Sequence, residues 1–247
     1  MDEEVPRLSL QDLVVTSWGS REEDHKRSLG DGWPLAEDYV ALHTEAMRKI
    51  SKAAGSSPSQ SDQATILLGC HGLNLFIETM GLLVRGLFDV SAQLLRPLMD
   101  TQSLVYACAR GEDLASRYLE EEGKPLKAAE ARKLFVAHVR SEDDALANDL
   151  DRILSDDADA ANDLAHVKRL HGDKLSMVEA GKVTPTAWGM TDPGEAVRQS
   201  QAAISQEHGL LVSLKAFRTE VVGQRWIKEL DGMDTRLVKH MKLDRTS

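Results

Sequence analysis

Apolar residues recur along most of this chain at the spacing of amphipathic helices. Residues 34–54 place Val40, Met47 and Ile50 at helical intervals. Residues 63–85 are apolar on almost every side, which is typical of a buried helix. No stretch of useful length alternates apolar and polar residues as a strand does. The pattern predicts an all-α fold, an antiparallel helical bundle built around a central helical hairpin.

The hairpin is predicted from turn-forming residues between two apolar segments. Gly86 suits the end of the first helix and Asp89 the N-cap of the second, so we expect the chain to reverse near residue 87. One serine of the preceding loop, Ser59 or Ser61, is expected to cap the first helix. The two arms of the hairpin are therefore expected to lie antiparallel and in contact.

The rest of the chain is predicted to continue as helices around this hairpin. We expect helical segments at 113–123, 124–140, 141–165, 195–226 and 233–243. Residues 1–34 form a polar N-terminal segment, and residues 35–247 form a single helical domain. An irregular loop at about 172–194 interrupts that domain; loops of such length are often functional.

The composition limits which cellular compartment and which classes of binding partner are expected for this protein. The net charge of -10 argues against an extended nucleic-acid footprint, which needs an excess of Lys and Arg. Two cysteines, Cys70 and Cys108, are too few for a disulfide framework or a zinc site. The acidic N-terminus does not resemble a signal peptide, and no uncharged apolar run approaches the length of a membrane span. We expect a cytoplasmic protein that neither binds nor crosses a membrane.

The few polar residues of the hairpin are predicted to fall at matching heights. With the turn near residue 87, Arg96 is level with Glu78, and Asp100 is level with Asn74. His71 lies on the same face of the first arm, one turn before Asn74. We therefore predict a buried or half-buried network in which Arg96 bridges Glu78 and Asp100, with His71 and Asn74 nearby.

Two interpretations of this network are open. It fixes the pairing of the two helices, as buried ion pairs do in some proteins. Alternatively, the five residues line a polar pocket between helices that binds a ligand. Charge alone does not separate the two, because structural ion-pair networks resemble functional sites.

The sequence lacks several familiar catalytic and metal-binding motifs. Glu22-x-x-His25 is the only Glu-x-x-His pair, whereas a carboxylate-bridged di-metal bundle needs two such pairs. The sequence contains no glycine-rich phosphate loop and no nucleophile elbow. We therefore expect no metal and no cofactor.

One spacing matches a nuclease motif. Arg132 and His138 are separated by five residues, as in helical ribonucleases of the HEPN class, where an arginine precedes a histidine by a similar interval. With 8 histidines and many arginines in the chain, such a spacing also arises by chance. Arg132 and His138 are thus candidate catalytic residues only for an alternative hypothesis, a metal-independent ribonuclease that acts across a dimer.

The second arm of the hairpin resembles an uncharacterised, all-helical bacterial family. That family has a short turn followed by a helix with the pattern small-x-x-Leu-Leu-Arg-x-x-x-Glu/Asp and then aromatic and apolar residues. The matching residues here are Ala92, Leu94, Leu95, Arg96, Asp100 and Tyr106. The resemblance covers about residues 60–120. It implies a helical fold loosely similar to HEPN domains, some of which occur in bacterial defence loci, and it implies no catalytic residue.

Together these patterns favour one function over another. The leading hypothesis is a cytoplasmic helical protein that acts as a binding or assembly module, with homo-oligomers formed through an apolar helix face. The alternative is the HEPN-like ribonuclease, in a defence or toxin system, for which a nucleic acid would be the substrate. The sequence identifies no protein partner.

Overall fold

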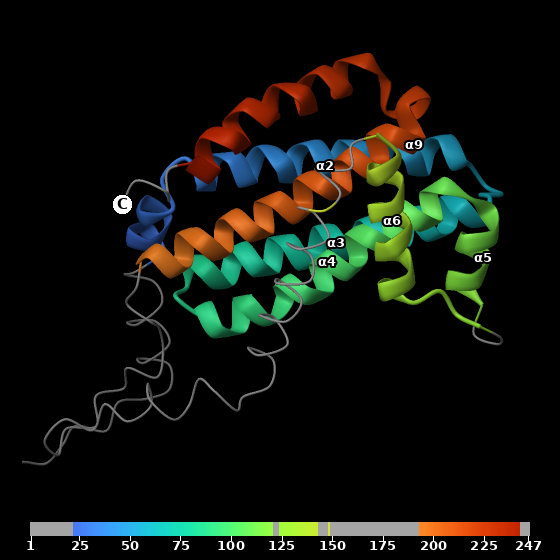
Figure 1. Ribbon diagram of the computed structural model, residues 1–247. Coiled ribbons are helices and arrows are strands. Elements are labelled where there is room, and N and C mark those ends of the chain that lie inside the picture. The colour runs from blue at the N-terminus through green and yellow to red at the C-terminus, as the bar shows by residue number, and fades with distance from the viewer. Residues whose placement is uncertain (1–21, 121–123, 143–147, 149–192, 243–247) are drawn as a thin grey trace, which may run out of the picture.

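The computed structural model describes residues 22–120, 124–142, 148 and 193–242. All regular secondary structure in these ranges is helical, which confirms the predicted all-α fold. The helices pack side by side as a bundle (Figure 1). They are α2 (Gly32–Ala54), α3 (Gln60–Val84), α4 (Phe88–Arg110), α5 (Glu112–Leu119), α6 (Ala128–Glu142) and α9 (Pro193–Lys242).

Helices α3 and α4 form the predicted central hairpin, and its turn follows from local chemistry. Gly86 has a φ of 74°, a conformation that glycine adopts without strain. The N–H of Gly86 donates to the Leu83 carbonyl at 3.0 Å, and the N–H of Leu87 donates to the Leu82 carbonyl at 2.9 Å. These two bonds are those of a Schellman motif, which ends a helix. The predicted reversal near residue 87 is confirmed.

Of the two predicted N-cap residues, the structure confirms the one of α3 and contradicts the one of α4. Ser59 caps α3, because its hydroxyl accepts from the Asp62 N–H at 3.1 Å. The predicted N-cap of α4, Asp89, is wrong. The Schellman turn leads directly into α4 at Phe88, so that Leu87 is the N-cap residue and Asp89 lies inside the helix.

Helix α9 consists of two arms, and its break differs from the predicted one. We expected one helix to end near Trp226 and another to begin near residue 233. Instead the helical path is interrupted at Arg218 (φ -132°, ψ 24°) and Gly223 (φ 82°, ψ 160°). After this break the second arm, red in Figure 1, returns along α2. Apolar residues continue at helical spacing across the break, so the hydrophobic pattern did not reveal it.

Arg218 fixes this break against the α3–α4 pair. Its guanidinium donates to the Ser61 hydroxyl at 2.7 Å and to the Ala109 carbonyl at 3.2 Å, and it lies 3.3 Å from a carboxylate oxygen of Asp62. The start of α3, the end of α4 and the bend of α9 therefore meet at one arginine.

The core is formed jointly by α2, α3, α4 and α9. Its largest fully buried side chains are Trp226 of α9, Tyr39 of α2, Tyr106 of α4 and Phe76 of α3. The indole N–H of Trp226 donates to the Leu42 carbonyl at 2.8 Å, which satisfies the polar atom of the largest core residue. This bond also holds the second arm of α9 against α2.

Helix α3 is the most apolar of these six helices. By length and composition alone α3 could cross a membrane, although we expected no such helix from the sequence. This is weak evidence for a membrane span, because the core helix of a soluble protein can be equally long and apolar. Helix α3 contacts α2, α4, α5 and α9. Less than half of its most apolar 18-residue window is buried. Helix α3 therefore presents apolar surface that no described residue covers.

Candidate functional site

Part of the predicted polar network is present between α4 and α6. The Nε of Arg96 lies 3.1 Å from one carboxylate oxygen of Asp100, as predicted. The other oxygen of Asp100 lies 3.1 Å from a guanidinium nitrogen of Arg132 on α6. The side chains of Arg96 and Asp100 are 27% and 28% exposed, and that of Arg132 is 14% exposed. Asp100 is thus held between two arginines at the half-buried edge of the bundle.

The other three predicted members lie elsewhere. His71, Asn74 and Glu78 are all exposed on the outer face of α3, so their predicted burial beside Arg96 and Asp100 is wrong. Matching heights along two antiparallel helices are a consequence of the turn alone. They do not determine how each helix is rotated about its own axis, and α3 turns its most apolar side inward.

The two candidate nuclease residues lie on α6, facing α4. Arg132 is ion-paired with Asp100, as described above. The ring of His138 is partly buried, and its centroid lies 5.7 Å from that of Tyr106. The ribonuclease hypothesis stays a prediction, because no observation singles these residues out as catalytic.

A buried polar cluster links α2 with both arms of α9, and the sequence analysis missed it. His43 Nδ1 lies 2.5 Å from Glu207 Oε1, and neither side chain is exposed. One turn away, Tyr39 Oη lies 2.9 Å from Nδ1 of His208, whose Nε2 is 3.3 Å from Asp234. Burial raises the pKa of Tyr39 and lowers the pKa of His208.

The only local signal for this cluster is the spacing of Tyr39 and His43 on the apolar face of α2. Their partners lie 169 and 164 residues further along the chain. The cluster leaves little room for a reactant, since Tyr39, His43 and Glu207 are fully enclosed by the core. We assign it a structural role in fixing how α9 packs on α2.

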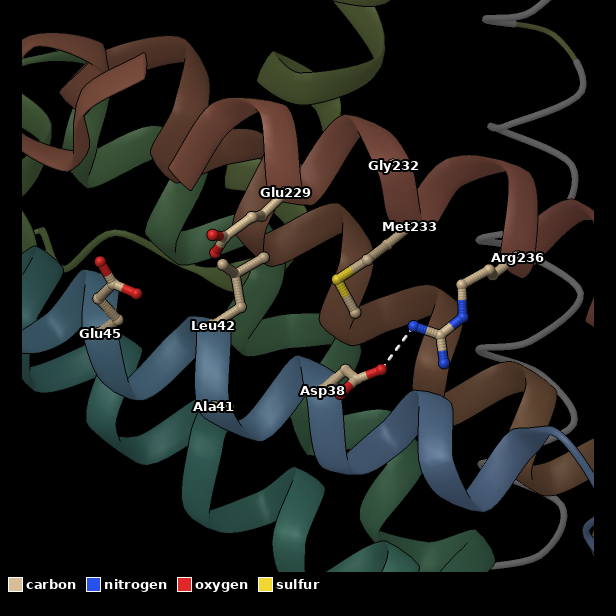
Figure 2. Close-up of a pocket in the computed structure, with 8 residues that line it drawn as sticks. All are labelled: Asp38, Ala41, Leu42, Glu45, Glu229, Gly232, Met233 and Arg236. Carbon is tan, nitrogen blue, oxygen red and sulfur yellow. Dashed lines mark hydrogen bonds and ion pairs between the residues drawn. The ribbon is translucent and has the colours of Figure 1, made fainter. Parts of the chain in front are cut away.

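A pocket of about 350 Å³ lies beside this cluster, between α2 and the second arm of α9 (Figure 2). Leu42 and Met233 lie between its two ends, and the ion pair of Asp38 with Arg236 bounds one of these. Glu45 lines the other end with Glu229. The full lining is Asp38, Ala41, Leu42, Glu45, Glu229, Gly232, Met233 and Arg236.

Each carboxylate of this pocket is already paired with a cation, Asp38 with Arg236 across the pocket and the two glutamates with cations on their own helices. Glu45 pairs with Lys49 at 2.8 Å, which lowers the pKa of Glu45. Glu229 pairs with Arg225 at 2.9 Å. Among the described residues, no group of three His, Cys, Asp or Glu side chains is arranged to hold a metal ion. The pocket therefore lacks an unmatched charge that would demand a ligand.

The second hollow, of about 500 Å³, differs because it is almost entirely apolar. It is a groove between α2 and α3, and its one charged residue, Glu37, accepts a hydrogen bond from the indole N–H of Trp33 at 2.9 Å. Its lining is Trp33, Ala36, Glu37, Val40, Ala41, Phe76, Ile77 and Met80. The groove is bounded by Ile77, whose side chain is 46% exposed.

Exposed residues continue from this groove along the outer face of α3, and they include both apolar and polar side chains. Leu67 is 57% exposed, and Cys70 lies between Leu67 and Ile77 on the same outer face. We call the groove together with the exposed face of α3 from Leu67 to Ile77 the α2–α3 surface. It is the candidate functional site, because it combines an apolar groove with the exposed Leu67 and Ile77, and exposed apolar surface often marks an interaction site.

No family model, curated protein or solved structure matches this chain. The resemblance of residues 60–120 to an uncharacterised helical family therefore stays a prediction. Any function must be inferred from the chain's own geometry.

Proposed function

We propose that this protein is an assembly module whose α2–α3 surface binds an apolar α-helix of another protein subunit. The observation that carries the proposal is the apolar groove bounded by Ile77, together with the protruding Leu67 on the same helix. A groove between two packed helices accepts a third helix, which contributes apolar residues at three- and four-residue steps. This is the binding or assembly role that the sequence favours.

The low charge of the α2–α3 surface supports the same proposal and specifies the chemistry of its occupant. Between residues 63 and 80, α3 carries a single formally charged side chain, that of Glu78, in a chain in which 28% of residues are charged. Burying this surface in an interface requires few ionised groups to lose their hydration. The occupant is therefore an apolar, weakly charged helix rather than a nucleic acid.

The other two sites support a function less well. The Arg96–Asp100–Arg132 cluster is internally ion-paired, and the pocket in Figure 2 is internally balanced in charge. Neither exposes a large apolar area. The α2–α3 surface is distinguished by an unfavourable exposure to water that a partner would remove.

A photo-crosslinking experiment tests the proposal. Ile77 is replaced by the photoreactive amino acid p-benzoylphenylalanine in the full chain, and intact producing cells are irradiated. We expect a discrete crosslinked protein whose attached peptide, identified by mass spectrometry, is an apolar helical segment. The crosslink should disappear when Leu67→Lys is added.

The matched control places the same photoreactive residue at Val238 on α9, where the side chain is 50% exposed. Val238 lies outside the α2–α3 surface, so it should give no discrete product. The proposal fails if the probes at Ile77 and Val238 give the same diffuse products, or if the peptide attached at Ile77 is polar.

A further inference from the structure

We infer that the subunit bound at the α2–α3 surface is a second copy of this chain, and that the two α3 helices pair antiparallel. This inference rests on the proposed function and names the partner. It begins from four exposed residues of α3 that are separated by the alternating three- and four-residue steps of a helix–helix seam. The residues of this seam are Leu67, Cys70, Asn74 and Ile77.

The seam residues of two copies lie opposite each other when the two α3 helices pair antiparallel about a two-fold axis. A two-fold axis perpendicular to α3 and level with Gly72 brings Leu67 of one copy opposite Ile77 of the other, because both lie five residues from the axis. The same rotation brings Cys70 opposite Asn74. The seam then has an apolar layer at each end and two small mixed layers in its centre.

The location of the groove favours the antiparallel arrangement over the parallel one. The groove opens at the end of α3 that contains Ile77 and Met80, whereas the most exposed apolar residue, Leu67, lies nearer the other end. Antiparallel pairing places Leu67 of each copy at the grooved end of the other. Parallel pairing would place the two Leu67 side chains against each other and leave both grooves open. Opposed helix dipoles also favour the antiparallel arrangement.

Charge is compatible with a second copy on this face. Each chain has a net charge of -10, so two copies repel each other over most of their surfaces. On the α2–α3 surface the seam itself carries no charge, and Glu78 lies to one side of it. Two copies therefore approach most favourably through this face. Asn74, the polar residue of the seam, would favour one alignment over shifted ones at some cost in affinity.

Sedimentation velocity over a range of concentrations tests the partner. We expect the purified full chain to form a dimer that Leu67→Lys and Ile77→Lys each convert to a monomer. Val238→Lys is the matched control, because it places the same charge on another exposed aliphatic residue, and it should leave the dimer intact. Circular dichroism shows whether each variant remains folded.

Disulfide formation tests the arrangement. In the antiparallel dimer Cys70 lies opposite Asn74 of the other copy, so Asn74→Cys should yield a covalent dimer on mild oxidation. The wild type should form no such disulfide, because its two Cys70 residues are offset from each other by four residues along the helix axis. Adding Cys70→Ser to Asn74→Cys should abolish the covalent dimer. Cys108 does not interfere, because burial raises the pKa of its thiol to about 12.

The outcomes separate this inference from the proposed function. Covalent dimers of the wild type through Cys70 would place the two Cys70 residues at the same level, and this would overturn the antiparallel arrangement about Gly72. A purified chain that is monomeric at every concentration, with a probe at Ile77 that still crosslinks to a helix of another protein, would overturn the second copy and leave the proposed function intact. A monomer without any such crosslink would overturn both.

Discussion

His43 Nδ1 lies 2.5 Å from Glu207 Oε1, and both side chains are completely buried between α2 and the first arm of α9. The second atom of each group, His43 Nε2 and Glu207 Oε2, has no hydrogen-bond partner among the described residues. A buried pair of this kind stabilises a fold weakly, because the attraction between its members is offset by the loss of their hydration. It does restrict how the two helices pack, since any shift separates two polar groups inside an apolar core.

This relationship predicts a strong non-additivity in stability. Removing one member, by His43→Leu or Glu207→Leu, should lower the free energy of unfolding by about 3–5 kcal/mol, because the other member is left buried and unpaired. The double variant should lose less than the sum of the two losses by at least about 1 kcal/mol. Urea denaturation of the four proteins measures the coupling. Additive losses would show that the two groups do not interact.

The half-buried pair of Arg96 and Asp100 should behave differently. Both side chains are more than a quarter exposed, so Arg96→Met should lower the free energy of unfolding by no more than about 1 kcal/mol. Asp100→Asn should cost about 1 kcal/mol more, because it leaves the guanidiniums of Arg96 and Arg132 facing each other without the carboxylate. Arg225→Met, which removes a fully surface pair with Glu229, is the control. A loss of several kcal/mol for Arg96→Met would contradict the half-buried geometry.

The hairpin was predictable because its signals are local. Gly86 lies between two apolar segments, and only a residue that adopts positive φ readily fits this turn. Ser59 likewise caps a helix that starts at the next residue. Such features depend on a few consecutive residues, so the sequence shows them directly.

The site was harder to predict because it depends on rotation and on distant contacts. The heights of His71, Asn74 and Glu78 along α3 followed from the turn, but the side of α3 on which they lie depends on packing against four other helices. The partner of His43 lies 164 residues away, and no spacing rule connects them. The bend at Arg218 is set by its contacts with the ends of α3 and α4, which become adjacent only in the folded bundle.

Two histidines of α9, the partly buried His208 and the buried His240, predict a loss of stability in mild acid. Burial lowers the pKa of His208, although Asp234 opposes this, and burial also lowers the pKa of His240, opposed by Asp31. Below the ordinary imidazole value of about 6.5 the unfolded chain therefore binds protons that the folded chain does not. The free energy of unfolding should fall as the pH decreases from about 7 to about 5.5.

Urea midpoints measured across this pH range test the effect, and the double variant His208→Gln/His240→Gln is the comparison. Glutamine does not titrate, so the double variant should show a shallower dependence on pH between about 7 and 5.5 than the wild type does. Equal slopes in the two proteins would mean that other groups cause the loss. The carboxylates with lowered pKa values, Glu45 and Glu130, affect stability only at lower pH.

Two glycines of α3 provide a matched test of how closely this helix packs on α2. A Cβ atom at Gly69 would lie 2.3 Å from the sulfur of Met47, whose side chain is only 6% exposed, whereas a Cβ atom at Gly81 would meet nothing within 4 Å. Gly81→Ala should raise the free energy of unfolding by about 0.5–1 kcal/mol, because alanine is the better helix former. Gly69→Ala receives the same gain from helix propensity, but it must displace a buried methionine at a cost of about 1–3 kcal/mol, so it should be destabilising overall. Thermal denaturation of the two variants compares them directly. Equal stabilisation by both would mean that α2 and α3 lie further apart than this structure has them, and the groove between Trp33 and Met80 would then be wider than a single helix needs.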